Sequence, residues 1–378
     1  MKTEKTVLTL TIILYFIVFL LPTSIQVRLF PVSINYILFG TYILFFSYKI
    51  KFVVTKWNYP VILLLLWSII GLIYAPDKLN GMKQVLSFVI LVLLSIRVTY
   101  LYSDSDLFTL VKILSIICIL YLIESYLTLN TLRDWEGAYI GISENRHNTS
   151  FLLGFMSILN LTSFIKTQNI FLKVTTILIV VICNYFIIET TSRIGFLCQL
   201  LFLVIIFPHF IRSLSLISNI IVFGIVFSVA FYVINLDSAQ DYISYSLERG
   251  ATGRDGINAS LMKYIDFNGG LFYLFGYGFG SLEYYSYLSE LFIRDANNLV
   301  ATVFIMGVIG LILFFIIFVK MILFYILNID DISKVLCCAV FFSIFLIPSE
   351  TTWFNYNYLY TIIMYILYMF LDNKKYSS

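Results

Sequence analysis

Three arginines stand where an anionic group could bind at the edge of an apolar segment. Arg193 follows the tetrad Glu-Thr-Thr-Ser and precedes an apolar run, whereas Arg249 and Arg254 lie in a polar stretch, residues 248–280. Arg254 falls in the first turn of a predicted helix, where unpaired backbone N–H groups and a guanidinium can together hold phosphate oxygens. The three side chains predict a pyrophosphate site. The alternatives are that Arg254 pairs with Glu248 or Asp255 on a solvated loop, and that Arg193 extends toward a lipid interface.

Several acids and one imidazole near these arginines could accept a proton from an attacking group. Their spacing does not choose among them. The candidates for a general base are Glu144, Glu248, Asp255, Glu350 and His147.

The cysteines and histidines predict no metal site. All five cysteines lie in apolar runs without CxxC spacing, and the two histidines, His147 and His209, are far apart in the sequence. We therefore expect neither a metal nor a cofactor.

The elements that must position these residues are membrane helices. Hydrophobic residues make up 61% of the chain and charged residues 12%, against about 25% charged in an average soluble domain. The net charge of +3 gives no case for nucleic acid. Apolar runs of about 17–22 residues recur, which predicts an all-α polytopic integral membrane protein with about 12 transmembrane helices. The predicted spans are 7–25, 30–48, 58–75, 84–101, 107–128, 149–165, 171–189, 194–211, 214–234, 299–319, 333–348 and 355–371.

The distribution of lysine and arginine predicts the orientation. With the N-terminus inside, the inner joints hold 13 of these residues, and the outer joints apart from the long loop hold 6. This bias predicts two cytoplasmic termini. The chain is then one membrane domain, 1–378, with a long extracytoplasmic loop, 235–298, between spans nine and ten. The joints 129–148 and 189–193 face the same outer side and could meet the long loop over one cavity.

The long loop is predicted to carry short amphipathic helices. Capping boxes begin at Ser238 and Thr252, and the second precedes apolar residues at helical spacing, which would lie on the bilayer surface. Residues 268–270 are expected to end that helix, and another is expected across 281–292. The sequence Gly-Tyr-Gly-Phe-Gly at 276–280 lacks nucleotide-loop spacing and is expected either to form a tight turn or to pack closely on membrane helices.

Three stretches resemble the O-antigen ligase and polymerase family of bacterial polysaccharide enzymes. They are Thr-Ser-Arg-Ile-Gly at 191–195, Thr-Gly-Arg-Asp-Gly at 252–256 followed by Gly-Tyr-Gly-Phe-Gly, and Asp-Ala-Asn-Asn-Leu at 295–299 followed by Gly-Val-Ile-Gly at 307–310. The segment 144–148 is similar to a weaker motif. The resemblance covers roughly the second half of the chain. It implies that Arg193 and Arg254 hold a donor pyrophosphate, with Asn297 and Asn298 in the site.

The resemblance implies a metal-independent glycosyltransferase that acts on undecaprenyl-pyrophosphate-linked glycan at the outer face of the bacterial cytoplasmic membrane. The family's ligases place a histidine before asparagine where this chain has Ala296 or Asn297. This departure favours a repeat-unit polymerase of the Wzy type, with a chain-length regulator and a flippase as further candidate partners. A ligase that transfers finished glycan remains open. A lipid-linked oligosaccharide flippase also remains open. A flippase would need charged residues lining the membrane interior, and Lys112 and Glu124 are the only charges expected well inside the spans.

Overall fold

The described part of the chain is built from helices. The structure is a computed structural model that describes residues 2–21, 36–46, 58–134, 137–141, 143, 145–213, 259, 261–263, 265, 270–282, 284–285, 298–346 and 359–370. Within these ranges no strand forms, and one isolated β-bridge joins Arg133 to Tyr139. The predicted all-α class is confirmed for these residues.

Apart from α13, each helix overlaps a predicted apolar run, while run 214–234 lies outside the described residues and the number of about 12 spans stays a prediction. Among the described residues, five helices are long and apolar enough to cross a membrane, namely α5, α6, α7, α8 and residues 299–327 of α15. A membrane-embedded protein follows, because a helix of about 20 apolar residues matches the hydrocarbon thickness. The elements are α1 (Lys2–Phe19), the π-helical turn η1 (Tyr36–Gly40), α3 (Thr41–Phe46), α4 (Tyr59–Gly71), α5 (Lys78–Leu101), α6 (Asp104–Thr128), α7 (Arg146–Lys166), α8 (Ile170–Glu189), α9 (Ile194–Ser213), α13 (Gly270–Phe275), α15 (Asn298–Leu327), α16 (Ile332–Phe345) and α17 (Leu359–Phe370).

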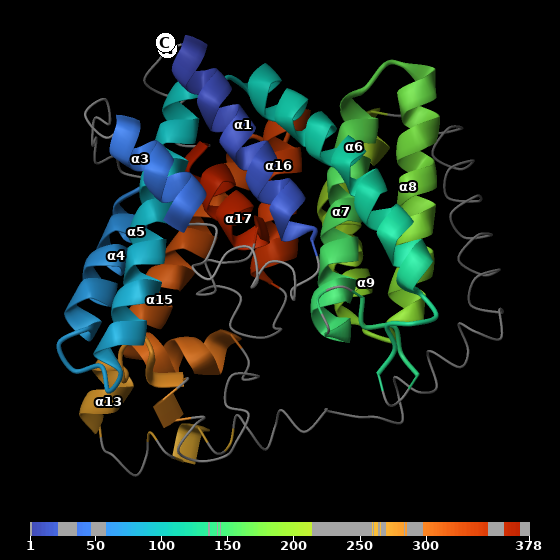
Figure 1. The fold of residues 1–378 in the computed structure, drawn as a ribbon. Helices are drawn as coiled ribbons and strands as arrows, with labels where there is room; N and C mark the ends of the chain where they lie inside the picture. The colour runs from blue at the N-terminus through green and yellow to red at the C-terminus, as the bar shows by residue number, and fades with distance from the viewer. Residues whose placement is uncertain are drawn as a thin grey trace.

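Two groups of helices flank a central pair. α6, α7, α8 and α9 form one group, α4, α5, α13 and α15 form the other, and α16 and α17 lie between them (Figure 1). Packing is continuous across the molecule, because α9 contacts α16, α16 contacts α17, and α17 contacts α5.

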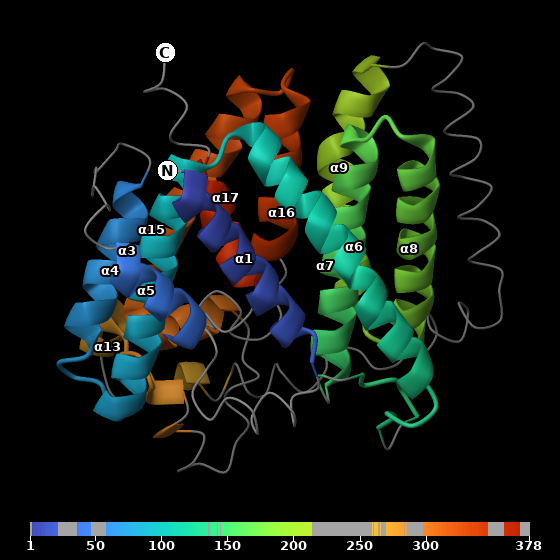
Figure 2. The same ribbon diagram turned by 45° about the horizontal axis from the view of Figure 1, so that its top comes forward.

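The connections between the helices lie at two opposite ends of the molecule (Figures 1 and 2). The first turn of α1, the α5–α6 turn and the α7–α8 turn lie at one end, hereafter the α1 end. The α4–α5, α6–α7 and α8–α9 connections and α13 lie at the other, hereafter the joint end. Side-chain caps begin several helices: Asp77 accepts from Asn80 N, Asn145 from His147 N, and Asp331 from Ser333 N. Such caps satisfy backbone donors that the first helical turn leaves unpaired.

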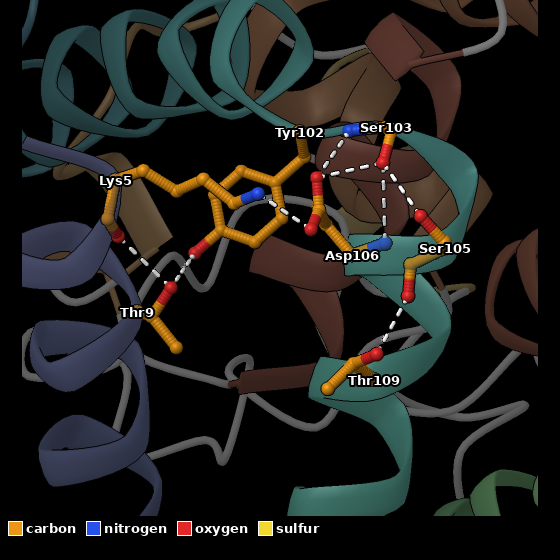
Figure 3. Close-up of polar contacts among 7 residues, drawn as sticks. All are labelled: Lys5, Thr9, Tyr102, Ser103, Ser105, Asp106 and Thr109. Carbon is orange, nitrogen blue, oxygen red and sulfur yellow. Dashed lines mark hydrogen bonds and ion pairs between the residues drawn. The ribbon is translucent and has the colours of Figure 1, made fainter. Parts of the chain in front are cut away.

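Polar contacts fasten α1 to the α5–α6 turn at the α1 end. Lys5 pairs with Asp106 at 2.5 Å, and the hydroxyls of Thr9 and Tyr102 share a hydrogen bond of 2.5 Å (Figure 3). Ser103 and Asp106 form a capping box that begins α6. The two ends of the chain segment 5–106 are thereby held together.

A buried ion pair lies beside this network. Arg97, inside α5, donates to Glu4 Oε1, and the side chains of Arg97 and Glu4 are 4% and 2% exposed. Tyr42 donates to the same oxygen at 3.3 Å. A pair this deep persists because each charge compensates the other.

The glycine-rich segment 276–280 packs on membrane helices as predicted. Gly276, Gly278 and Gly280 all have positive φ, and a Cβ on Gly278 would stand 2.4 Å from Gly71 O. Only glycine allows this backbone approach. Gly270 begins α13, and the predicted end of the preceding helix at 268–270 stays a prediction because residues 266–269 lie outside the described residues.

The same segment completes a kink in α15. Gly307 has φ 66° and ψ −172°, which interrupts the helix. Donors from elsewhere reach the carbonyls on its N-terminal side: Tyr277 N donates to Phe304 O at 2.7 Å, Gly278 N to Ile305 O at 2.8 Å, and Trp67 Nε1 to Met306 O at 2.9 Å. The break therefore leaves these buried polar groups satisfied.

Candidate functional site

The α6–α7 and α8–α9 connections meet at the joint end. Tyr139 N donates to Glu189 O at 2.9 Å, and Arg133 Nη2 donates to Glu189 Oε2 at 2.8 Å. The acid that opens the tetrad before Arg193 is therefore paired with Arg133.

Hydrogen bonds within the α6–α7 connection fix its shape. Arg133 also donates to the carbonyls of Leu129 and Gly137, at 3.0 and 2.6 Å. Asp134 accepts from Ala138 N at 2.9 Å and pairs with Arg146 at 3.3 Å. Two arginines of this connection are thus held by carboxylates, and they form a framework beside the α8–α9 turn.

Tyr139 anchors the connection in the protein. Its ring is fully buried, and its hydroxyl shares a hydrogen bond of 3.1 Å with Thr128 Oγ1 at the end of α6. Burial raises the pKa of the Tyr139 phenol, because the low-polarity surroundings disfavour the phenolate. The phenol therefore stays protonated and available as a donor.

The α8–α9 turn is held in an uncommon conformation. Thr191 has φ 50°, a left-handed backbone that β-branched residues seldom adopt. Ser192 is buried, and its hydroxyl lies 2.9 Å from His147 Nδ1. Ser150 Oγ donates to Ser192 O at 3.1 Å and accepts from Gly195 N at 3.0 Å. Contacts from α7 therefore hold the turn in place.

Small residues let α7 and α9 approach closely under this turn. A Cβ on Gly195 would stand 2.5 Å from Ser150 O, and one on Gly154 would stand 2.8 Å from Gly195 O. Backbone contact of this kind is typical of membrane helix pairs with small residues four apart. Sequence reasoning missed Ser150, Ser192 and Gly154. The Ser-x-x-x-Gly spacing of 150–154 was the available signal.

Arg193 caps the N-terminus of α9. Its carbonyl accepts from Leu197 N at 3.0 Å, and its side chain is exposed. A helix N-terminus carries a partial positive charge, and a guanidinium beside it adds a full one. The buried Ser192 turn therefore holds the backbone of Arg193, and the exposed Arg193 side chain places a positive charge at the joint end.

The structure brings together some of the predicted site residues. His147, in the first turn of α7, reaches Ser192, the chain neighbour of Arg193. Asn298 is described only in its backbone, as the first residue of α15. The remaining predicted residues lie outside the described part of the chain, namely Glu144, Arg249, Arg254, Asp255 and Asn297. Their place in the site stays a prediction.

No group of three or more His, Cys, Asp or Glu side chains that could hold a metal occurs among the residues that the structure describes. The chemistry that this end of the molecule offers is cationic and hydroxyl-rich.

Comparison with known proteins adds no relative: no known family model matches the chain, and no curated protein matches it significantly.

Proposed function

We propose that the protein transfers a growing glycan from undecaprenyl pyrophosphate to a lipid-linked repeat unit, as a polysaccharide repeat-unit polymerase. The observation that carries the proposal is that a buried turn holds Arg193 at the start of α9. An exposed guanidinium at the N-terminus of a 20-residue helix, set on a buried turn, suits a group with the charge of a pyrophosphate. The likeness of segments 191–195, 252–256 and 295–299 to the O-antigen ligase and polymerase family supports the same function.

The reaction needs positioning and charge stabilisation. A hydroxyl oxygen of the acceptor sugar forms a bond to the anomeric carbon of the donor glycan, and the bond from that carbon to the pyrophosphate oxygen breaks. The electron pair leaves with the lipid pyrophosphate, and the hydroxyl proton passes to a base. Arg193, with Arg249 and Arg254 as further proposed ligands, would stabilise the charge on the leaving group.

The proposed setting is the outer face of the bacterial cytoplasmic membrane, with both termini cytoplasmic. In this orientation the joint end faces outward and the α1 end faces the cytoplasm. Support comes from the excess of Lys and Arg in the predicted inner joints. The arrangement puts Arg193 on the side where lipid-linked repeat units are joined.

The test replaces Arg193 with alanine in cells that make the polymer. We expect R193A to shorten the glycan to single repeats, with turnover of the purified enzyme lowered roughly 100- to 1,000-fold, while the protein stays in the membrane. The matched control is Lys173→Ala, which removes a cation from the start of α8, at the opposite end of the molecule. If R193A and R254A both left the chain length unchanged, the pyrophosphate site would be refuted.

The same experiment separates the competing functions. Loss of a ligase would accumulate full-length lipid-linked polymer, whereas loss of a polymerase accumulates single lipid-linked repeats. Loss of a flippase would leave lipid-linked repeats on the cytoplasmic face, where an added impermeant glycosidase does not reach them.

A further inference from the structure

The last two turns of α6 carry a row of oxygen-bearing side chains. Tyr121, Glu124, Ser125 and Thr128 follow at spacings of three and four residues, so they share one side of the helix. Tyr121 and Ser125 are 2% and 0% exposed. The hydroxyls of Ser125 and Thr149 lie beside that of Tyr121, and the Glu124 carboxylate is close enough to act on Tyr121. We name Tyr121, Glu124 and Ser125 the α6 cluster.

Three buried polar atoms of this cluster lack partners. Although the Ser125 and Thr149 hydroxyls lie near that of Tyr121, none of Tyr121 OH, Glu124 Oε2 and Ser125 Oγ has a partner at hydrogen-bond geometry among the described residues. Ser115 on the same helix behaves differently, because its hydroxyl donates to Val111 O at 2.9 Å. Buried polar atoms are nearly always paired, so three unpartnered atoms on one side of a helix suit a bound polar group that forms hydrogen bonds with them.

The α6 cluster lies directly beneath the candidate site. Glu124 is one turn from the end of α6, about 6 Å along the helix axis. Thr128, at that end, bonds Tyr139, whose N–H donates to Glu189 O just before the Arg193 turn. Thr149 approaches from α7, and its hydroxyl donates to Ile140 O at 2.5 Å. Hydrogen-bonded residues therefore join the cluster to the Arg193 turn.

The chemistry of the three atoms selects a hydroxyl-bearing ligand. The carboxylate oxygen accepts a hydrogen bond, and the Tyr121 and Ser125 hydroxyls can each donate one. A hydroxyl group satisfies both demands, because it donates to Glu124 and accepts from a neighbour. A hydrocarbon chain satisfies neither, and an anion would be repelled by the carboxylate.

We propose that the α6 cluster binds a hydroxyl of the acceptor sugar and that Glu124 is the general base for it. This inference rests on the proposed polymerase function and supplies the base that sequence reasoning left open. As the acceptor oxygen bonds to the anomeric carbon, its proton moves to Glu124 Oε2, and the electron pair of the broken bond leaves with the pyrophosphate. Tyr121 and Ser125 hold the acceptor oxygen.

The kinetic test uses purified full-length protein in vesicles, with lipid-linked glycan extracted from the producing strain. We expect E124Q to lower turnover about 100- to 10,000-fold, the range of a lost general base. Y121F and S125A should raise KM several-fold and spare turnover. Matched controls on the same helix are Ser115→Ala and Tyr126→Phe, the latter 73% exposed, and both should behave as wild type.

A labelling test reports binding without turnover. Dicyclohexylcarbodiimide reacts with carboxyl groups in apolar surroundings, and label present in wild type but absent in E124Q is label on Glu124. The extracted lipid-linked glycan should slow this labelling several-fold. If the wild type extends glycan and E124Q extends it equally, or the glycan leaves labelling unchanged, the role of Glu124 is refuted and the polymerase function stands. If the wild type extends nothing and its labelling is also unchanged, both are refuted.

Discussion

Replacing Arg97 with methionine should destabilise the protein far more than breaking an exposed ion pair. Methionine keeps much of the side-chain volume of Arg97 but leaves the Glu4 carboxylate, which is 2% exposed, with Tyr42 as its donor and with Oε2 unpartnered among the described residues. Leaving one charge of a buried pair uncompensated costs about 3–5 kcal/mol.

The comparison variants separate charge from packing. Lys5→Met breaks the Lys5–Asp106 pair, whose side chains are 34% and 28% exposed. It should cost no more than about 1 kcal/mol, because solvent screens exposed pairs. The double variant Glu4→Gln with Arg97→Met removes both buried charges and should be more stable than R97M alone.

The assay is thermal unfolding of the purified protein in detergent, followed by the fluorescence of a thiol-reactive dye that reacts with the buried cysteines as they become exposed. R97M should unfold at a clearly lower temperature than K5M, with the double variant between R97M and wild type. Equal shifts for R97M and K5M, or a double variant less stable than R97M, would refute the view that the pair persists by charge compensation.

Two further predictions concern glycines. Gly307→Ala should destabilise the protein by at least about 2 kcal/mol, because its φ is +66° and the new Cβ would stand 2.2 Å from Leu274 O; Gly270→Ala, with nothing within 4 Å of its Cβ, should unfold like wild type, and equal midpoints for the two would contradict the strain argument. Gly195→Ala should push α9 from Ser150 and weaken the His147–Ser192 contact, which cysteine cross-linking between positions 147 and 192 would detect as slower disulfide formation; an unchanged rate would show that the helices adjust without moving the turn.

The sequence pattern predicted the long apolar helices. A membrane helix pairs its own backbone polar groups, so a long apolar run is enough to indicate one. The pattern was also sufficient for the packing role of segment 276–280, since glycines at alternate positions indicate close backbone contact. It failed for the ion pair of Glu4 with Arg97. Both residues stand near helix ends, where charges are common, and 93 positions separate them.

The candidate site was likewise predicted from the sequence only in part. Arg193 was found because it stands between the polar tetrad Glu-Thr-Thr-Ser and an apolar run. Ser192, one residue earlier, was missed because its partners His147 and Ser150 lie on another helix, up to 45 positions away. The α6 cluster was found only in part. Glu124 was noted as a charge inside a span, but Tyr121 and Ser125 were missed. Tyrosine and serine are ordinary in membrane helices, and only the absence of partners among the described residues makes their hydroxyls unusual.

The kink at Gly307 also makes the shape of α15 depend on other parts of the chain. Segment 276–280 rests its backbone on α4 and α5, with a Cβ on Gly278 only 2.4 Å from Gly71 O and with Gly280 N bonded to Gln84 Oε1 at 3.0 Å. From that position Tyr277 and Gly278 donate to the carbonyls that precede the kink. The bend is therefore specified jointly by Gly307 and by the segment that fills the broken hydrogen-bond pattern, and the sequence of α15 alone does not specify it.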